Sequence, residues 1–248
     1  MKFNFLTLFP QFLISYFEYS ILKRAIAKNL IEVSCIDIRE FGISTHLKVD
    51  APPIGGGAGQ VLLFEVLQNA LEQVKDSHII FLSPCAKRFC QNDAIRLAKK
   101  SHISFVCGRY EGFDERLIEC FADEVFSVGD FIMSGGELAA LSLSDSIARQ
   151  IKGVLGNADS LKGESFEFHL LEAPNFAKNS TQTEKILKNF EYLATPSGYS
   201  KGNHNKIDAL KLDLAIAKTK YFRPDLYLSY KTQQCRLSDS YQGVDYEK

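Results

Sequence analysis

The stretch "SVGDFIMSGGEL", from Ser127 to Leu138, places two adjacent glycines between a β-rich run and a strongly helical one. A Walker loop needs a Lys and a Ser or Thr directly after its last glycine, but here Gly136 is followed by Glu137 and Leu138. A Rossmann fingerprint needs three spaced glycines after the first strand of the fold, and this stretch lies in mid-chain. Neither common nucleotide-binding glycine pattern is therefore present.

Around this loop, the chain up to about residue 156 alternates β-rich runs with stretches of helical periodicity. The expected strands are Phe3–Phe9, Ile31–Ile38, His78–Pro84, His102–Gly108 and Asp123–Asp130. The expected helices are Pro10–Lys28, Val61–Lys75, Ala86–Lys100, Phe113–Phe121 and Gly136 to about Ile151. Strands that alternate with helices of this length need crossover connections. The pattern therefore predicts an α/β fold with a mostly parallel sheet covered on both faces.

Three of the expected strands end in distinctive loops, which are Leu82–Ala86, Cys107–Arg116 and the opening stretch. Because ligands of open α/β sheets bind beyond the carboxyl ends of the strands, we expect one site built from these loops. Glycines let backbone groups approach a ligand closely. Neither "GRYEG" nor "MSGGEL" has a lysine to meet a phosphate. The loops therefore suit a neutral or zwitterionic ligand, for example an adenosine with an amino-acid tail, better than a triphosphate. The alternative is that the glycines serve only tight turns.

A further glycine cluster, "IGGGAGQ", runs from Ile54 to Gln60. Three consecutive glycines lose much backbone entropy on folding, so another interaction must compensate. A tight turn, a subunit contact and a close approach to a substrate are three possible compensations, and the sequence does not choose among them.

The composition is that of a folded globular protein, with 46% hydrophobic and 24% charged residues in a chain of 248. No apolar run approaches the roughly 20 residues that span a bilayer, and the start lacks the features of a signal peptide. We therefore expect a cytoplasmic protein without a membrane partner. The six cysteines form no CxxC pair, which favours buried free thiols over a zinc or redox site, and no metal-binding residues are expected.

The charge is uneven along the chain. The segment Asn175 to Pro224 has nine Lys or Arg and four Asp or Glu, a net charge of +5, so the remainder of this chain of net charge -1 carries -6. Such a segment suits a polyanion, although a solvated lysine-rich helix face would look the same. Two stretches with helical spacing, Thr181–Ala194 and Asn205–Phe222, indicate a small helical domain. The expected domains are 1–156, a flexible linker or lid at 157–174, and a helical domain at 175–248.

Several motifs resemble those of the bacterial tRNA (guanine-N1)-methyltransferases of the TrmD type. They are, in order, "GGGAG" (Gly55–Gly59), "LSP" (Leu82–Pro84), "CGRYEGFDERLI" (Cys107–Ile118), "SVGDFIMSGGELAAL" (Ser127–Leu141), "DSIARQIKGVLG" (Asp145–Gly156), "ESF" (Glu164–Phe166), "LLEAP" (Leu170–Pro174) and "GNH" (Gly202–His204). The likeness spans nearly the whole chain.

This resemblance implies a SPOUT-class fold with a deep trefoil knot, a feature that pattern reasoning alone would not propose. It also implies a homodimer with active sites at the subunit interface and S-adenosyl-L-methionine held by the knotted loops. The implied substrate is the guanosine at tRNA position 37, next to the anticodon, with the helical C-terminal domain gripping the anticodon stem-loop. Whether magnesium assists stays open.

The resemblance also assigns roles to individual residues. Implied cofactor contacts are Leu82, Ser83, Pro84, Gly108, Tyr110, Glu111, Gly112, Val128, Gly129, Phe131, Met133, Gly135, Gly136 and, from the partner subunit, the position of Glu172. Arg149 matches the arginine that contacts the guanine. Glu164 stands in "GESF" where the family has an aspartate as its proposed base, so the longer side chain could act directly or through water.

Two other departures from the family pattern occur. Ile54 and Gln60 replace a frequent Tyr and Met beside the glycine turn, and Lys178 replaces a usual arginine, which weakens bidentate recognition of a phosphate or base without removing the charge. Three alternative functions stay open at this point. They are a SPOUT ribose 2′-O-methyltransferase, a non-catalytic tRNA-binding protein and a nucleotide-phosphate enzyme.

Overall fold

The structure, a computed structural model, describes residues 1–178, 180–187, 195–200 and 203–242. The chain divides into two compact units, Met1–Asp159 and Ser160–Lys248. The boundary between them falls within the stretch 157–174 that we expected as a linker.

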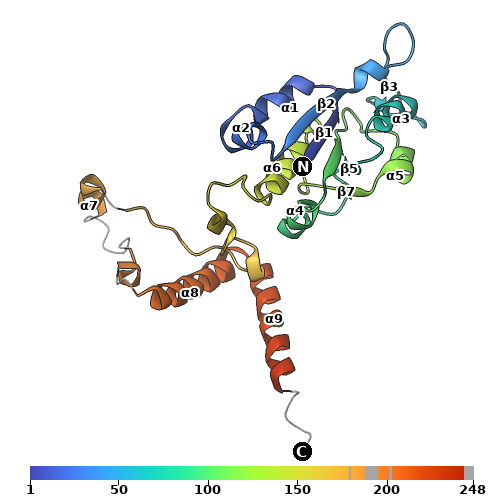
Figure 1. The fold of residues 1–248 in the computed structure, drawn as a ribbon. Coiled ribbons are helices and arrows are strands. Elements are labelled where there is room, and N and C mark those ends of the chain that lie inside the picture. The colour runs from blue at the N-terminus through green and yellow to red at the C-terminus, as the bar shows by residue number, and fades with distance from the viewer. Residues whose placement is uncertain (179, 188–194, 201–202, 243–248) are drawn as a thin grey trace, which may run out of the picture. The chain divides into compact units, whose positions relative to one another are not determined.

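The first unit is built on a five-stranded sheet in the order β2-β1-β6-β5-β7 (Figure 1). The strands are β1 (Lys2–Thr7), β2 (Glu32–Asp37), β5 (His78–Leu82), β6 (His102–Val106) and β7 (Glu124–Phe126). Every neighbouring pair in this sheet is parallel. The predicted α/β class and mostly parallel sheet are therefore confirmed, and each strand lies within or beside its expected range.

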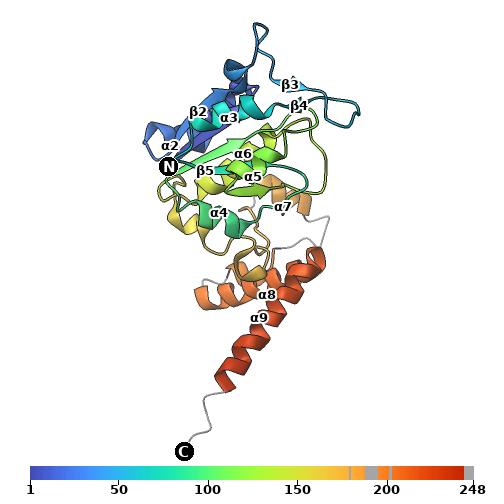
Figure 2. The same cartoon turned by 90° about the vertical axis from the view of Figure 1, so that its right-hand side faces the viewer.

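Helices cover both faces of the sheet. Successive residues of a strand point to opposite faces, so the strands supply apolar side chains to a core on each side. On one face, Phe5 and Phe105 stack with ring centroids 5.4 Å apart, beneath α1 (Pro10–Phe17), α2 (Ser20–Ala27), α4 (Gln91–Leu97) and α6 (Glu137–Arg149). On the other face, Leu6, Phe81 and Val106 pack against α3 (Phe64–Glu72) and α5 (Arg116–Phe121). Figure 2 looks onto the side that α3 and α5 cover.

Several predicted helices are shorter than expected. Pro10–Lys28 is two helices, because the chain turns at Tyr19 and Ser20, where Tyr19 is extended and Ser20 has a φ of 53°. The stretch expected as a helix from Val61 instead begins with a strand, β4 (Val61–Leu62), which pairs antiparallel with β3 (Asp50–Ala51). Neither of these two-residue strands was predicted, because two residues are too short to show a periodic pattern.

All described elements of the second unit are helical. They include α7 (Thr181–Leu187), α8 (His204–Phe222) and α9 (Pro224–Gln242), with short 3-10 turns at Glu167–His169 and Ser197–Ser200. A further 3-10 turn, Ala158–Leu161, contains the boundary between the units. Part of the expected helix Thr181–Ala194, residues 188–194, lies outside the described residues. No described helix in either unit is long and apolar enough to cross a membrane.

Candidate functional site

Three loops meet at the carboxyl edge of the sheet, where β5, β6 and β7 end. The loop after β5 and the loop after β7 are joined by backbone hydrogen bonds, since Ser127 N–H donates to Lys87 C=O (2.9 Å) and Phe89 N–H donates to Ser127 C=O (2.8 Å). The loop after β6 is joined to the same segment, because Gly136 N–H donates to Gly108 C=O (2.9 Å). The segment 127–136 is thus bonded to both other loops.

Gly136 lies against the backbone of the loop after β6. A Cβ atom at this position would lie 2.9 Å from Cys107 Cα and 3.0 Å from Gly108 N, closer than real Cβ atoms approach. Its φ of -79° is open to any residue, so the close approach alone requires glycine here.

A cavity of about 270 Å³ lies among the three loops, close to the lower end of the range of roughly 300–1,000 Å³ for small-molecule sites. Thirteen of the fourteen residues expected to contact a cofactor line it, all except Glu172. They are Leu82, Ser83, Pro84, Gly108, Tyr110, Glu111, Gly112, Val128, Gly129, Phe131, Met133, Gly135 and Gly136. The structure therefore gathers into one cavity residues that span 55 positions of sequence, from 82 to 136.

Eight further residues line the same cavity and were not singled out from the sequence. They are Cys85, Arg109, Phe113, Glu115, Phe126, Ser127, Ile132 and Ala139. Most lie beside predicted residues in the same three loops, so the signal that could have found them is their place in the quoted motifs.

The lining combines apolar side chains with two carboxylates. Val128 and Met133 are half-buried and offer apolar surface to a planar group, whereas Glu111 and Glu115 are exposed acids at the rim. The positive charge of Arg109 in the lining is balanced by Glu137, so Glu111 and Glu115 leave the cavity with a negative balance. Such a cavity suits a ligand that has both a flat apolar part and a positive charge.

A buried carboxylate ties the site to the sheet. Glu137, the first residue of α6, is 1% exposed and accepts a hydrogen bond from Thr7 Oγ1 (2.8 Å) at the end of β1. Its two carboxylate oxygens also lie 3.1 and 2.9 Å from Arg109 Nε. Burial raises the pKa of the neighbouring Cys107 thiol well above its usual value, and the Glu137 charge adds to the effect, so this thiol is neutral and inert.

Arg109 holds the loops after β6 and β7 together. Its guanidinium donates to Ser134 C=O (3.0 Å) and lies over the ring of Phe9, 4.3 Å from the ring centroid. Gly135 is required beside it, since a Cβ there would meet the Arg109 side chain, with Cδ only 2.6 Å away. Sequence reasoning assigned no role to Arg109 or Glu137, although an acid directly before the apolar run "LAAL" was an available signal.

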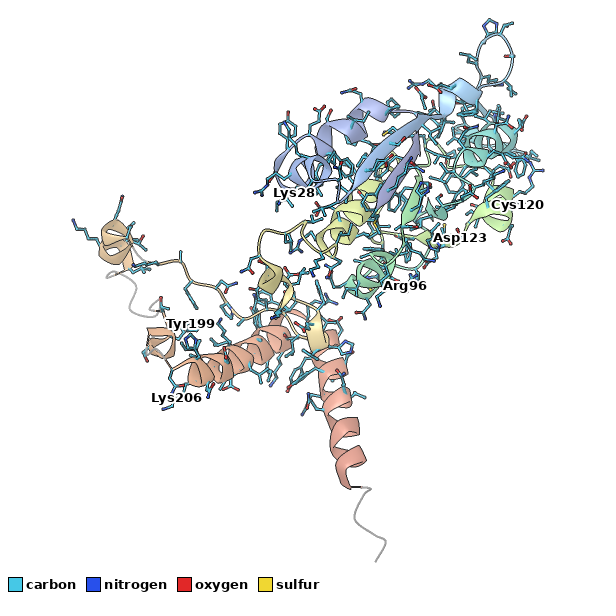
Figure 3. The ribbon with its side chains drawn as sticks, in the orientation of Figure 1. Lys28, Arg96, Cys120, Asp123, Tyr199 and Lys206 are labelled. Carbon is cyan, nitrogen blue, oxygen red and sulfur yellow. The ribbon has the colours of Figure 1, made fainter. Side chains whose placement is uncertain are left out.

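The loop after β5 has its own electrostatic anchor. Lys87 Nζ lies 3.1 Å from Asp93 on α4, and Arg96, labelled in Figure 3, bridges Asp93 (3.2 Å) to Glu124 on β7 (2.6 Å). Burial alone would raise the pKa of Glu124, but hydrogen bonds from Arg96 and His78 outweigh it and hold that pKa below its ordinary value. These ion pairs fix the loop to the sheet edge.

The remaining predicted residues lie elsewhere in the chain. Arg149 is the last residue of α6 and is half-buried. Glu164 and Glu172 belong to the second unit, where Glu172 N–H donates to Ser165 Oγ (3.1 Å) and Lys218 Nζ donates to Glu172 C=O (3.0 Å). Glu164 and Glu172 therefore lie in one segment that local hydrogen bonds hold together. The residues that line the cavity belong to the first unit.

No group of three or more His, Cys, Asp or Glu side chains is placed to hold a metal ion within the part of the chain that the structure describes. The thiols of Cys35, Cys85, Cys90, Cys107 and Cys120 are free. Burial raises the pKa of Cys35 to about 11, as expected for a thiol packed in a core.

Known proteins match the chain over most of its length. The family model described as tRNA (Guanine-1)-methyltransferase TrmD matches residues 1–229. A protein of Helicobacter hepaticus named tRNA (guanine-N(1)-)-methyltransferase is 62% identical over 231 residues, covering 93% of this chain and 94% of that protein. Proteins with the same name from Helicobacter pylori (57%, covering 94% of this chain and 100% of that protein) and Sulfurimonas denitrificans (54%, covering 94% and 99%) are also similar.

Replacing Gly136 with alanine is expected to lower the free energy of unfolding by about 1–3 kcal/mol, because the added methyl group meets backbone that cannot yield. Urea unfolding followed by circular dichroism measures the loss. Gly156→Ala is the matched control, since a Cβ at Gly156 meets nothing within 4 Å. Equal stabilities of the two variants would contradict the close-approach argument.

Replacing Arg109 with leucine is expected to cost about 3–5 kcal/mol, because it leaves the Glu137 carboxylate buried without its cation. The double variant Arg109→Leu/Glu137→Leu should recover much of this loss. Arg88→Leu is the control, as its ion pair with Asp130 is 70% and 73% exposed and should contribute less than about 1 kcal/mol. The midpoints of urea unfolding, compared at one protein concentration, measure the stability lost in each variant. If Arg109→Leu lowers the free energy of unfolding no more than Arg88→Leu does, the buried ion pair between Arg109 and Glu137 has no special role in stability.

Proposed function

Because the chain belongs to the tRNA (guanine-1)-methyltransferase family described by TrmD, we propose that it methylates N1 of a guanine in tRNA, at position 37 next to the anticodon. The observation that best supports this function is the single cavity lined by thirteen residues of the family motifs. The identity of the target position rests on the resemblance of those motifs.

S-adenosyl-L-methionine is the proposed methyl donor and the cavity is its proposed site. When bound, it supplies an activated methyl group on a positively charged sulfonium. The residues fit it, since Val128 and Met133 give apolar surface for the adenine and Glu111 and Glu115 face a positive charge. Backbone groups at Gly108 and Gly135, which are only half-buried and have no side chain to block a ligand, would complete the site.

Glu164 and Arg149 are the proposed catalytic residues. Guanine N1 holds a proton and is a poor nucleophile until that proton is lost, and negative charge then develops on O6. Glu164 accepts the N1 proton, and Arg149 donates to O6 as a permanently charged, planar donor. Glu172 faces the amino group of the cofactor from the partner subunit.

We also propose that the chain forms a trefoil knot and that it assembles as a homodimer. The segment 127–136 is hydrogen-bonded to the loop after β5 on one side and to Gly108 on the other, an arrangement that suits a chain threaded between two loops.

Large apolar side chains are exposed on and around α1, including Phe12 (48%) and Tyr19 (71%), which suits a subunit interface. An active site shared between subunits would bring Glu172 to the partner's cavity.

The second unit is proposed to grip the anticodon stem-loop through phosphates. Lys206, Lys211 and Lys220 on α8 are exposed, and Lys220 Nζ lies 5.9 Å from the ring centroid of Tyr227, an aromatic and basic combination that suits RNA. Of the basic segment, Lys188, Glu191 and Lys201 lie outside the described residues. We propose that the stretch 157–174 acts as a lid that orders over the target base.

The names of the relatives do not favour the three alternative functions. A ribose 2′-O-methyltransferase would not need the carboxylate of Glu164. A non-catalytic tRNA-binding protein would not need the cavity, and a nucleotide-phosphate enzyme would need a phosphate-reading lysine in the glycine loops.

Transfer of labelled methyl from S-adenosylmethionine to an unmodified tRNA transcript with guanosine at position 37 tests the proposal. Wild-type transfer to N1 should fall by ~100-fold or more in Glu164→Gln and in Arg149→Ala, the usual scale for losing a general base or a charge-stabilising donor. Glu72→Gln on α3 and Arg24→Ala on α2, both at exposed helix positions, are the matched controls and should keep wild-type rates.

The possible results separate the parts of the proposal. Full transfer in Glu164→Gln would keep the enzyme and exclude Glu164 as the base. Binding of tRNA without any transfer by the wild type would favour the non-catalytic protein. Methyl found on a ribose oxygen would favour the 2′-O-methyltransferase.

A further inference from the structure

The glycine loop Ile54–Gln60 runs directly into the wall of the cavity. Glu111 N–H donates to Gln60 C=O (2.9 Å), Leu62 N–H donates to Gly112 C=O (3.0 Å) and Asp114 N–H donates to Leu62 C=O (3.1 Å). The end of the loop and the segment 111–114 therefore form a short ladder of backbone hydrogen bonds. Leu62 and Phe113, which face each other in this ladder, are 0% and 7% exposed, so the ladder is held in the core.

Four glycines of this loop have left-handed backbone conformations but different surroundings. The φ angles of Gly55, Gly56, Gly57 and Gly59 are +96°, +84°, +119° and +93°. A Cβ at Gly55 or Gly56 would meet nothing within 4 Å, and at Gly57 only an atom of Pro53 at 3.9 Å. A Cβ at Gly59 would meet the Glu111 side chain, with Cγ at 2.5 Å and Cδ at 2.8 Å. Of the four, only Gly59 combines this strained conformation with a neighbouring side chain that an added Cβ would meet.

We propose that Gly59 is a positioning residue for Glu111: its bare Cα leaves the space in which the Glu111 carboxylate lies at the rim of the cavity. The ladder holds the backbone of Glu111 in place. The missing side chain at Gly59 leaves open the space that the Glu111 side chain occupies. Because Glu111 is exposed and flexible, a methyl group at residue 59 displaces the carboxylate rather than the backbone. The consequence for ligand binding rests on the proposed function, in which Glu111 faces a positively charged cofactor.

The test compares Gly59→Ala with Gly55→Ala, because both glycines have strained left-handed conformations with nearly equal φ angles. Calorimetry with S-adenosylmethionine should give an approximately fivefold higher Kd for Gly59→Ala, the upper range for an exposed charge interaction, and less than about twofold for Gly55→Ala. The difference should shrink in high salt, as screening requires. In a Glu111→Ala background, Gly59→Ala should have no further effect on Kd, because no carboxylate is left to displace.

A second readout does not depend on the cofactor. The carboxyl-carbon NMR resonance of Glu111, assigned by its loss in Glu111→Gln, should shift in Gly59→Ala and stay in place in Gly55→Ala. An unchanged resonance in Gly59→Ala would overturn the positioning role, whatever the enzyme does. An equally large rise in Kd in the Glu111→Ala background would overturn it too. A shifted resonance in a protein that binds no S-adenosylmethionine would leave the positioning intact and contradict the proposed function instead.

Discussion

The close approach of Gly136 to the backbone at Cys107 and Gly108 is the constraint on which the rest of the site depends. A side chain there would force α6 and the loop after β6 apart, because its Cβ would lie only 2.9 Å from Cys107 Cα. The hydrogen bond from Gly136 to Gly108, the start of α6 and the position of Glu137 all follow from this contact. Glycines at positions 108, 135 and 136 of the lining allow the loops after β6 and β7 to approach each other this closely.

The buried carboxylate of Glu137 then holds the loops in one arrangement. Glu137 reaches Thr7 on the inner strand β1 and Arg109 in the loop after β6, so one carboxylate links the sheet, the helix and two loops. A buried ion pair contributes little net stability compared with apolar packing, but removing one partner is costly. Its effect here is to define one arrangement of the loops, and the same loops place Glu111 where Gly59 leaves room for it.

The sequence predicted the sheet and the site better than the local details. The strands and the convergence of three loops followed from periodicity and from the rule for parallel sheets, and the family motifs selected thirteen residues that share one cavity. The break between α1 and α2 was missed because Ser20 in a left-handed conformation leaves no clear pattern. Arg109 and Glu137 were missed because their roles depend on a contact across 28 residues. The contact between Gly59 and the Glu111 side chain is none of the three explanations offered for the glycine loop, because it joins residues 52 positions apart and no local pattern contains it.

A crystal structure of the protein with S-adenosylhomocysteine, the product that methyl transfer would leave, tests the proposed site most directly. We predict the ligand in the cavity between Leu82–Pro84, Gly108–Gly112 and Val128–Gly136. The backbone of those loops should contact its adenine, and its amino-acid tail should lie within reach of a carboxylate. A ligand bound at another place, or an empty cavity in crystals of an enzyme that transfers methyl groups, would contradict it.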